Sequence, residues 1–235
     1  MKKMTLMQHF SELRRRILWV VLIFVCAFIV GWYVAPWVQE FLTAPLLSVW
    51  GEGELIYTGL TDGLMIQFSL ATLFALAIIG PVVLWHVWAF VAPGLKQNER
   101  GVILPLIIMS PILFLLGAGF AFYFLFPIVF KFFVELNQSA PVPAILLPAA
   151  RDYLAFAIGL LKVFGVAFQL PLVLVLLNRI GVLGRGRVMK MRRYAIVIIL
   201  IMAAILTPPD VVSQVLLALP MWALFEISIL FMRHD

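Results

Sequence analysis

The acidic side chains that could bind a cationic ligand lie close to the ends of long apolar segments. Glu99 belongs to the stretch from Ala89 to Arg100, which leaves an apolar segment and turns at Pro93-Gly94. A carboxylate in such a loop can receive a positively charged peptide through charge-assisted hydrogen bonds, and it binds the planar guanidinium group of arginine better than it binds lysine. The plainer interpretation is a solvated loop acid that pairs with Lys96 or Arg100.

Glu12 offers the same choice in the basic amino-terminal arm. Arg15 and Arg16 follow it at positions i+3 and i+4, the spacing at which side chains meet on one face of a helix. Glu12 can therefore pair inside its own helix or bind a basic ligand. Both interpretations stay open on spacing alone.

Lys162 and Gln169 stand inside an apolar segment, where polar groups are costly and often functional. A lysine at the centre of a bilayer costs about 3 kcal/mol or more. The seven-residue spacing predicts that both side chains share one helical face. One interpretation is an intramembrane functional site. The other is that each residue has a structural role: Lys162 extends its amine toward water, and Gln169 hydrogen-bonds a neighbouring helix.

No arrangement of residues predicts catalysis or a bound cofactor. The sequence has no phosphate-binding loop, no nucleophile elbow and no metal-binding pair of histidines. His9, His86 and His234 are scattered, and we interpret them as interfacial or capping residues. Cys26 is the single cysteine and lies in an apolar run, so the chain can form no internal disulfide. We expect a protein that is not an enzyme.

The composition is that of an integral membrane protein. Of the 235 residues, 65% are hydrophobic and 12% are charged, whereas soluble domains average about half apolar and a quarter charged. The formal charge of +6 does not indicate nucleic-acid binding, because the basic residues fall between the apolar runs.

Six membrane-spanning helices in one domain, residues 1–235, account for the apolar runs. A bilayer core of about 30 Å needs about 20 helical residues. We predict an all-α fold in which the last two segments are short and the many prolines give bent helices and a concave shape. The predicted segments are Ile17–Pro36, Leu64–Ala92, Val102–Phe130, Tyr153–Leu177, Tyr194–Leu206 and Val211–Phe231.

The distribution of lysine and arginine predicts the orientation. The amino-terminal arm, the loop around Glu99, the loop before Tyr194 and the carboxyl-terminal tail are basic, whereas the other loops are mostly acidic. Because basic loops stay in the cytoplasm, both termini are predicted to be cytoplasmic. The outer loops, 37–63 and 131–152, are long enough to form a cap.

Five sequence blocks resemble those of the TatC family, the multi-spanning core of the twin-arginine protein translocase. They are HFSELRRR at 9–16, TAPL at 43–46, PVVLWHVWAFVAPGLKQNER at 81–100, FGVAFQLPLVLVLL at 164–177 and LTPPDVVSQVLLALPMWALFE at 206–226. The resemblance implies a multi-pass protein of a bacterial or archaeal cytoplasmic (inner) membrane. It implies binding of twin-arginine signal peptides on folded cargo, recruitment of TatA-like and TatB-like single-helix partners, assembly with other copies of itself, and export driven by the proton-motive force.

The resemblance also implies roles for individual residues. It implies that Glu99 contacts the twin arginines, with Glu12, Arg14 and Phe90 on the same surface. Gln169 matches an intramembrane position where family members carry Glu or Gln, and Thr207 and Gln214 match a patch where partners dock. Further family positions are Pro45 and Asp210.

Two features depart from the family pattern. Asp62 stands where family members often carry a glutamate, and Lys162 matches no required family position. A small-solute or ion transporter, with Lys162 and Gln169 as its midplane site, is the alternative function. The basic arm, Phe90 and Glu99 favour the signal-peptide receptor, because a solute carrier needs no specific cytoplasmic acid.

Overall fold

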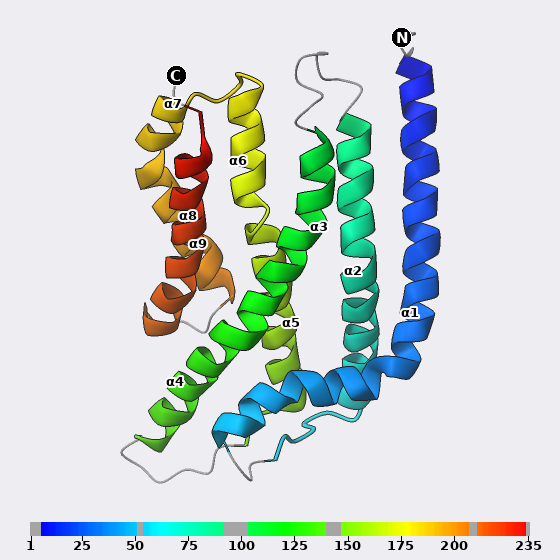
Figure 1. The fold of residues 1–235 in the computed structure, drawn as a ribbon. Coiled ribbons are helices and arrows are strands. Elements are labelled where there is room, and N and C mark those ends of the chain that lie inside the picture. Colours follow the sequence, from blue (N-terminus) through cyan, green and yellow to red (C-terminus); the bar gives the residue numbers. More distant parts are fainter. Residues whose placement is uncertain (1–5, 51–53, 92–102, 140–146, 207–210, 234–235) are drawn as a thin grey trace. The chain divides into compact units, whose positions relative to one another are not determined.

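The computed structural model describes residues 6–50, 54–91, 103–139, 147–206 and 211–233, and these are almost entirely helical (Figure 1). The elements are α1 (Leu6–Trp50), α2 (Asp62–Val91), α3 (Ile103–Phe120), the π-helical turn η3 (Ala121–Leu125), α4 (Phe126–Gln138), α5 (Ala150–Ala167), α6 (Leu170–Arg179), α7 (Arg185–Lys190), α8 (Arg192–Leu206) and α9 (Val211–Phe231). No β-strand occurs among them, and a single parallel bridge joins Ile56 to Ala149.

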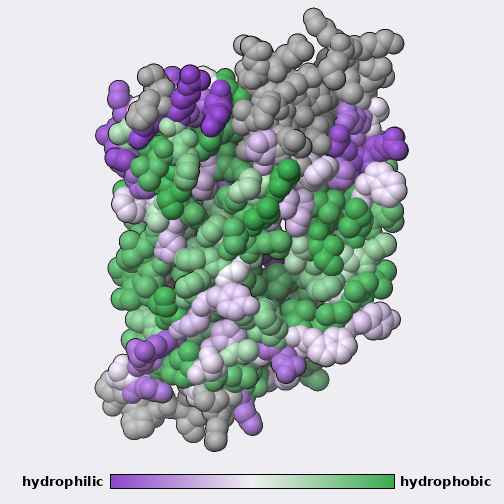
Figure 2. Space-filling view, in the orientation of Figure 1, coloured by the Kyte–Doolittle hydropathy of each residue, from purple (hydrophilic) through white to green (hydrophobic). Residues whose placement is uncertain are grey.

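Five stretches of the described helices are long and apolar enough to cross a membrane: 11–50, 62–86, 108–138, 150–179 and 211–231. Large apolar side chains along them are exposed, including Ile17, Tyr123 and Leu230, and hydrophobic residues cover the middle of the helices in Figure 2. Helix α8 has only 15 residues, so the prediction of a short fifth segment is confirmed. Helix α9, with 21 residues, has the length of a full span.

The chain divides into two compact units. Unit 1 contains residues 1–38 and 67–112, and unit 2 contains residues 39–66 and 113–235. Helices α1, α2 and α3 each contribute residues to both units. Each unit is described below by itself.

In unit 1, α1 and α2 pack as an antiparallel pair. A Cβ atom added to Gly31 would lie 2.8 Å from the carbonyl oxygen of Ala71, so the glycine allows the two backbones to approach closely, as small residues do between membrane helices. The rings of Phe28 and Phe68 meet edge to face at 5.1 Å beside this contact.

A proline in α1 explains a hydrogen bond between the same two helices. Pro36 has no N–H group, so the carbonyl of Trp32, four residues earlier, lacks its helical donor. The side-chain amide of Gln67 donates to that carbonyl at 2.9 Å. Membrane helices tolerate proline when a neighbouring side chain satisfies the freed carbonyl in this way.

Unit 2 is built around aromatic side chains. Phe126 and Phe164 are fully buried, and the ring of Phe120 contacts those of Phe164 and Phe168 at 5.9 and 5.7 Å. Gly117 lies against α5, where an added Cβ would be 2.4 Å from the carbonyl oxygen of Phe164. Small residues and interlocking rings therefore hold α3 against α5.

The predicted fourth segment, 153–177, is two helices. Helix α5 ends at Ala167 and α6 begins at Leu170. Pro171 causes the break, because its ring clashes with the carbonyl of Ala167 and it cannot donate a hydrogen bond to it. The N–H of Gln169 bonds instead to the carbonyl of Val166, at 2.9 Å.

Two predicted outer loops are shorter than expected because the helices before them continue. Helix α1 runs through Pro36 to Trp50, and the third predicted segment continues through α4 to Gln138. Ahead of Pro127 the chain widens into η3, where the N–H of Phe126 bonds to the carbonyl of Ala121, five residues back. This wider turn carries the helix past a proline that cannot donate.

Candidate functional site

Glu12 and Arg16 form an ion pair on one face of α1. The Nε and Nη2 atoms of Arg16 both donate to Oε1 of Glu12, at 3.0 and 2.5 Å. The Nη1 atom of Arg16 lies 3.3 Å from Nδ1 of His86, near the end of α2. Arg16 therefore connects the acid of one helix to the imidazole of the next, and the question left open by spacing is answered in favour of Arg16 over Arg15.

No donor among the described residues binds the second carboxylate oxygen of Glu12. Its Oε2 atom is buried and has no hydrogen-bond partner among the described residues. A buried acceptor without a donor costs about 1–3 kcal/mol. Glu12 consequently has one oxygen bound by Arg16 and one buried oxygen that no donor of the described residues satisfies.

Other residues predicted for this surface belong to the same unit. The side chain of Arg14 is exposed on α1. Phe90 is in the last turn of α2, four residues and so about one helical turn after His86. The side chain of Phe90, and Glu99 as a whole, lie outside the described residues.

Lys162 and Gln169, which are predicted to share one helical face, do not lie in one continuous helix. The helix breaks between them at Phe168-Gln169. The side chain of Lys162 is exposed, whereas Gln169 is 8% exposed. A seven-residue spacing places two side chains on one face only in a continuous helix, and Pro171 interrupts this one.

Gln214 makes a bond between α8 and α9. Its side-chain amide donates to the carbonyl oxygen of Leu200 at 3.0 Å, which is the helix-joining role that its chemistry alone predicts. An apolar groove of about 200 Å³ follows along the two helices, lined by residues that include Ile196, Val215 and Trp222. Thr207 and Asp210 lie outside the described residues.

Pro45 and Asp62 occupy structural positions in unit 2. Pro45 is buried within α1. Asp62, 3% exposed, accepts hydrogen bonds through Oδ2 from the N–H groups of Thr58 and Gly59 and from the Thr58 hydroxyl. Its Oδ1 is 3.4 Å from Nη1 of Arg151. The carboxylate thus organises the turn before α2 and ties it to α5.

Sequence reasoning missed the partnership of His86 with Arg16 and the ion pair between Arg192 and Glu226. The latter joins α8 to α9 with an Nη2–Oε2 distance of 2.7 Å. The available signals were a histidine within an apolar segment and an acid at the end of another. Neither pairing has a local spacing that identifies it, because the partners are 70 and 34 residues apart.

Spanning helices with exposed apolar surfaces, and polar groups that satisfy freed carbonyls or form ion pairs near helix ends, define a multi-pass membrane protein. Residues 8–220 match the family model of the Sec-independent protein translocase protein (TatC). The chain therefore belongs to the TatC family, which forms part of a protein translocase of the inner membrane and is not enzymatic.

Individual relatives agree with this assignment. The chain is 40% identical to the Sec-independent protein translocase protein TatC of Magnetococcus marinus, over 99% of this chain and 85% of that protein. It is 35% identical to TatC of Escherichia coli K12, over 97% and 88%. A crystal structure of the twin-arginine translocase receptor TatC matches with a TM-score of 0.85 and 35% identity, over 95% of this chain and 97% of that one. The predicted family and helical membrane fold are confirmed.

Proposed function

We propose that this chain is the receptor for twin-arginine signal peptides of folded proteins, with Glu99 and Glu12 binding the two arginines. The observation that carries the proposal is the half-engaged carboxylate of Glu12, whose Oε2 has no partner among the described residues. Family membership supports a receptor role, because a solved relative is itself a twin-arginine translocase receptor.

The chemistry of the ligand follows from the geometry of Glu12. Its Oε1 atom already accepts two hydrogen bonds from Arg16, so a second guanidinium that reaches the buried Oε2 need not displace the first. A planar guanidinium presents parallel donors to carboxylates, whereas a lysine amine is a point charge. Arg14 and Phe90 complete the surface, with Phe90 contacting the apolar residues that follow the arginines.

The remaining residues serve later steps of the same process. Gln169 contacts the apolar stretch of the signal within the membrane. Thr207 and Gln214 mark where TatA-like and TatB-like single-helix partners dock, and the adjacent apolar groove on α8 and α9 offers an apolar surface to such a helix. Both termini face the cytoplasm, other copies of the chain assemble with it, and the proton-motive force drives export.

Binding of a fluorescent signal peptide to the purified chain tests the proposal. Peptides with Arg-Arg and Lys-Lys are compared on the wild type, Glu99→Ala, Glu99→Gln and the control Glu135→Gln, whose side chain is exposed on α4. We expect both Glu99 variants to lose about tenfold or more in affinity for the Arg-Arg peptide, and the control to bind normally. Equal binding by all four proteins would refute recognition at Glu99.

The transporter alternative is not favoured. The family is a protein translocase component, and Lys162 and Gln169 are separated by a helix break and differ in exposure.

A further inference from the structure

One end of unit 2 concentrates positive charge. Seven of the chain's lysine and arginine residues lie between Asn178 and Arg233, namely Arg179, Arg185, Arg187, Lys190, Arg192, Arg193 and Arg233. The acids in this range are Glu226 and Asp210, and Asp210 follows the opposite end of α8. Figure 2 shows the hydrophilic residues gathered around α7.

The backbone at this end is fixed by a specific set of bonds. Asn178 donates through Nδ2 to the carbonyl of Leu183 at 3.1 Å and accepts through Oδ1 from the N–H of Arg233 at 2.7 Å. Gly181 adopts φ of +74°, which lets the chain turn immediately after α6. Val188 of α7 and Met232 are buried beneath the turn. The basic residues are therefore held on a rigid platform, residues 178–193 together with Arg233.

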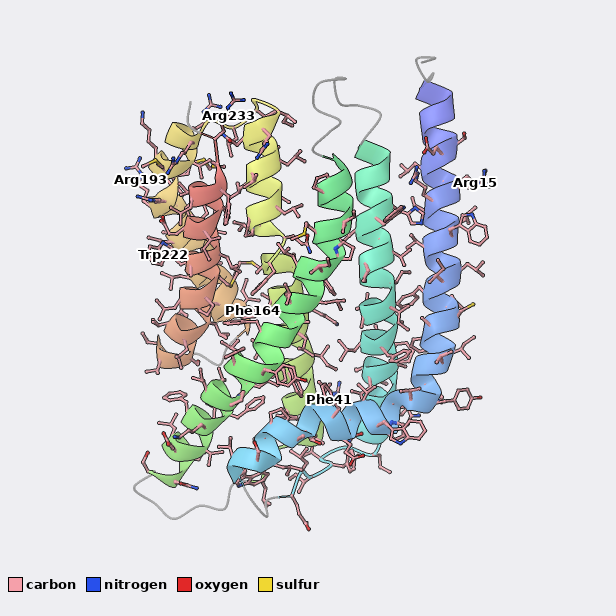
Figure 3. All side chains as sticks on the ribbon, viewed as in Figure 1. Arg15, Phe41, Phe164, Arg193, Trp222 and Arg233 are labelled. Carbon is pink, nitrogen blue, oxygen red and sulfur yellow. The ribbon has the colours of Figure 1, made fainter. Side chains whose placement is uncertain are left out.

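Four of these cations form no ion pair with the residues that the structure describes. Arg192 pairs with Glu226, and the guanidinium of Arg193 lies over the Tyr194 ring at 4.8 Å. Arg179, Arg187, Lys190 and Arg233 are exposed, and no ion pair to them is formed by the residues the structure describes. Figure 3 shows Arg193 and Arg233 at the same end of the unit.

Exposed apolar side chains lie among the cations. Val182, Met189, Met191 and Tyr194 are all exposed, although the platform stands at the ends of membrane-spanning helices. Apolar side chains that alternate with lysine and arginine are typical of segments at the boundary between headgroups and acyl chains. An acidic region of a soluble protein could pair with the cations but would leave these apolar side chains in contact with water.

We propose that the platform is a binding site for the headgroups of anionic phospholipids. The cations bind the lipid phosphates, and the exposed apolar side chains enter the adjoining acyl region. Basic loops follow from membrane topology in general. The preference for basic cytoplasmic loops does not require the charges to lie on one rigid surface. It also does not require that Glu226 be the single acid beside them, so it does not explain this arrangement.

Lipid selectivity of the full chain tests the proposal. The chain is reconstituted in phosphatidylcholine bilayers, and electron spin resonance measures its association with spin-labelled phosphatidylglycerol relative to spin-labelled phosphatidylcholine. The double variant R187Q/K190Q removes two platform charges, R187K/K190R keeps them, and K131Q removes one exposed charge on α4 as a control. Thermal unfolding confirms that each variant is folded.

We expect R187Q/K190Q to lose about fivefold in relative association for each charge removed, and the charge-preserving variant and the control to match the wild type. High salt should weaken the selectivity of the wild type. Unchanged selectivity in R187Q/K190Q, or an equal loss in K131Q, would overturn the proposal. Displacement of the labelled lipid by inorganic phosphate would instead identify a site for free anions. The lipid measurement does not depend on signal-peptide binding. Each of the two proposals can therefore be refuted without affecting the other.

Discussion

Glu12 in unit 1 and Glu226 in unit 2 are bound by arginine in similar ways but in different structural settings. Each carboxylate gives one oxygen to an arginine and keeps the other buried without a partner among the described residues. Glu12 pairs with Arg16 of its own helix, whereas Glu226 pairs with Arg192 of another helix. A pair within one turn can exchange partners without separating helices, while a pair between helices contributes to their packing.

Two glutamines show a related difference. Gln67 in unit 1 and Gln214 in unit 2 each donate to a backbone carbonyl of a neighbouring helix. The carbonyl of Trp32 has lost its helical donor to Pro36. The carbonyl of Leu200 lies inside α8, where Ala204 follows four residues later with an N–H group. The glutamine bond therefore replaces a missing helical hydrogen bond in unit 1. In unit 2 it is made to a carbonyl that also has a helical donor available.

The largest expected effect on ligand binding separates the two acids. Glu12→Gln should weaken binding of an Arg-Arg signal peptide by about tenfold, because a neutral amide loses the charge assistance of a carboxylate. Glu226→Gln should bind the peptide as the wild type does. Fluorescence anisotropy with the labelled peptide measures both affinities. An equal loss in the two variants would show that the shared geometry, and not the location, determines binding.

A second comparison separates the two glutamines by stability. Gln67→Leu should lower the free energy of unfolding by about 2 kcal/mol, because it leaves the Trp32 carbonyl without a donor. Gln214→Leu should lower it by about 0.6 kcal/mol, the average for a hydrogen bond between membrane helices. Titration with denaturing detergent gives both values. If Gln214→Leu proves the more costly change, the roles assigned to the two glutamine bonds are reversed.

The smallest effect concerns the two ion pairs themselves. Removing the Arg192 pair by Glu226→Gln should lower the free energy of unfolding by about 1 kcal/mol or less, since both side chains are partly exposed. Glu12→Gln should lower it by about 0.3–0.5 kcal/mol, as for other pairs at i and i+4. Unfolding at low and high salt checks the values, because screening should reduce both. A loss of unfolding free energy that does not change with salt would show that the side chain stabilises the fold through packing and not through its charge.

The segments that the sequence could predict are those with local causes. Helix α9 spans 211–231 as predicted, because its apolar run ends at a charged tail on one side and at a proline pair on the other. The short α8 follows from Arg193 and Pro208, which bound its apolar run. These boundaries depend on neighbouring residues only, so composition and spacing are sufficient to find them.

The features that the sequence could not predict have causes elsewhere in the chain. The continuation of α1 past Pro36 is accompanied by a hydrogen bond from Gln67 of α2. The pairing of Glu12 with Arg16 also depends on α2, because His86 of that helix contacts the same arginine. Its spacing from Arg15 and Arg16 makes Glu12 a candidate but does not show which of its oxygen atoms accepts a hydrogen bond.

The bond from Gln67 to Trp32 also bears on how the protein is made. Gln67 follows Trp32 by 35 residues in the chain, so the donor reaches the membrane after the acceptor. During that interval the first helix lacks the donor that compensates for Pro36. The bond that compensates for Pro36 can therefore form only once both helices are in the membrane.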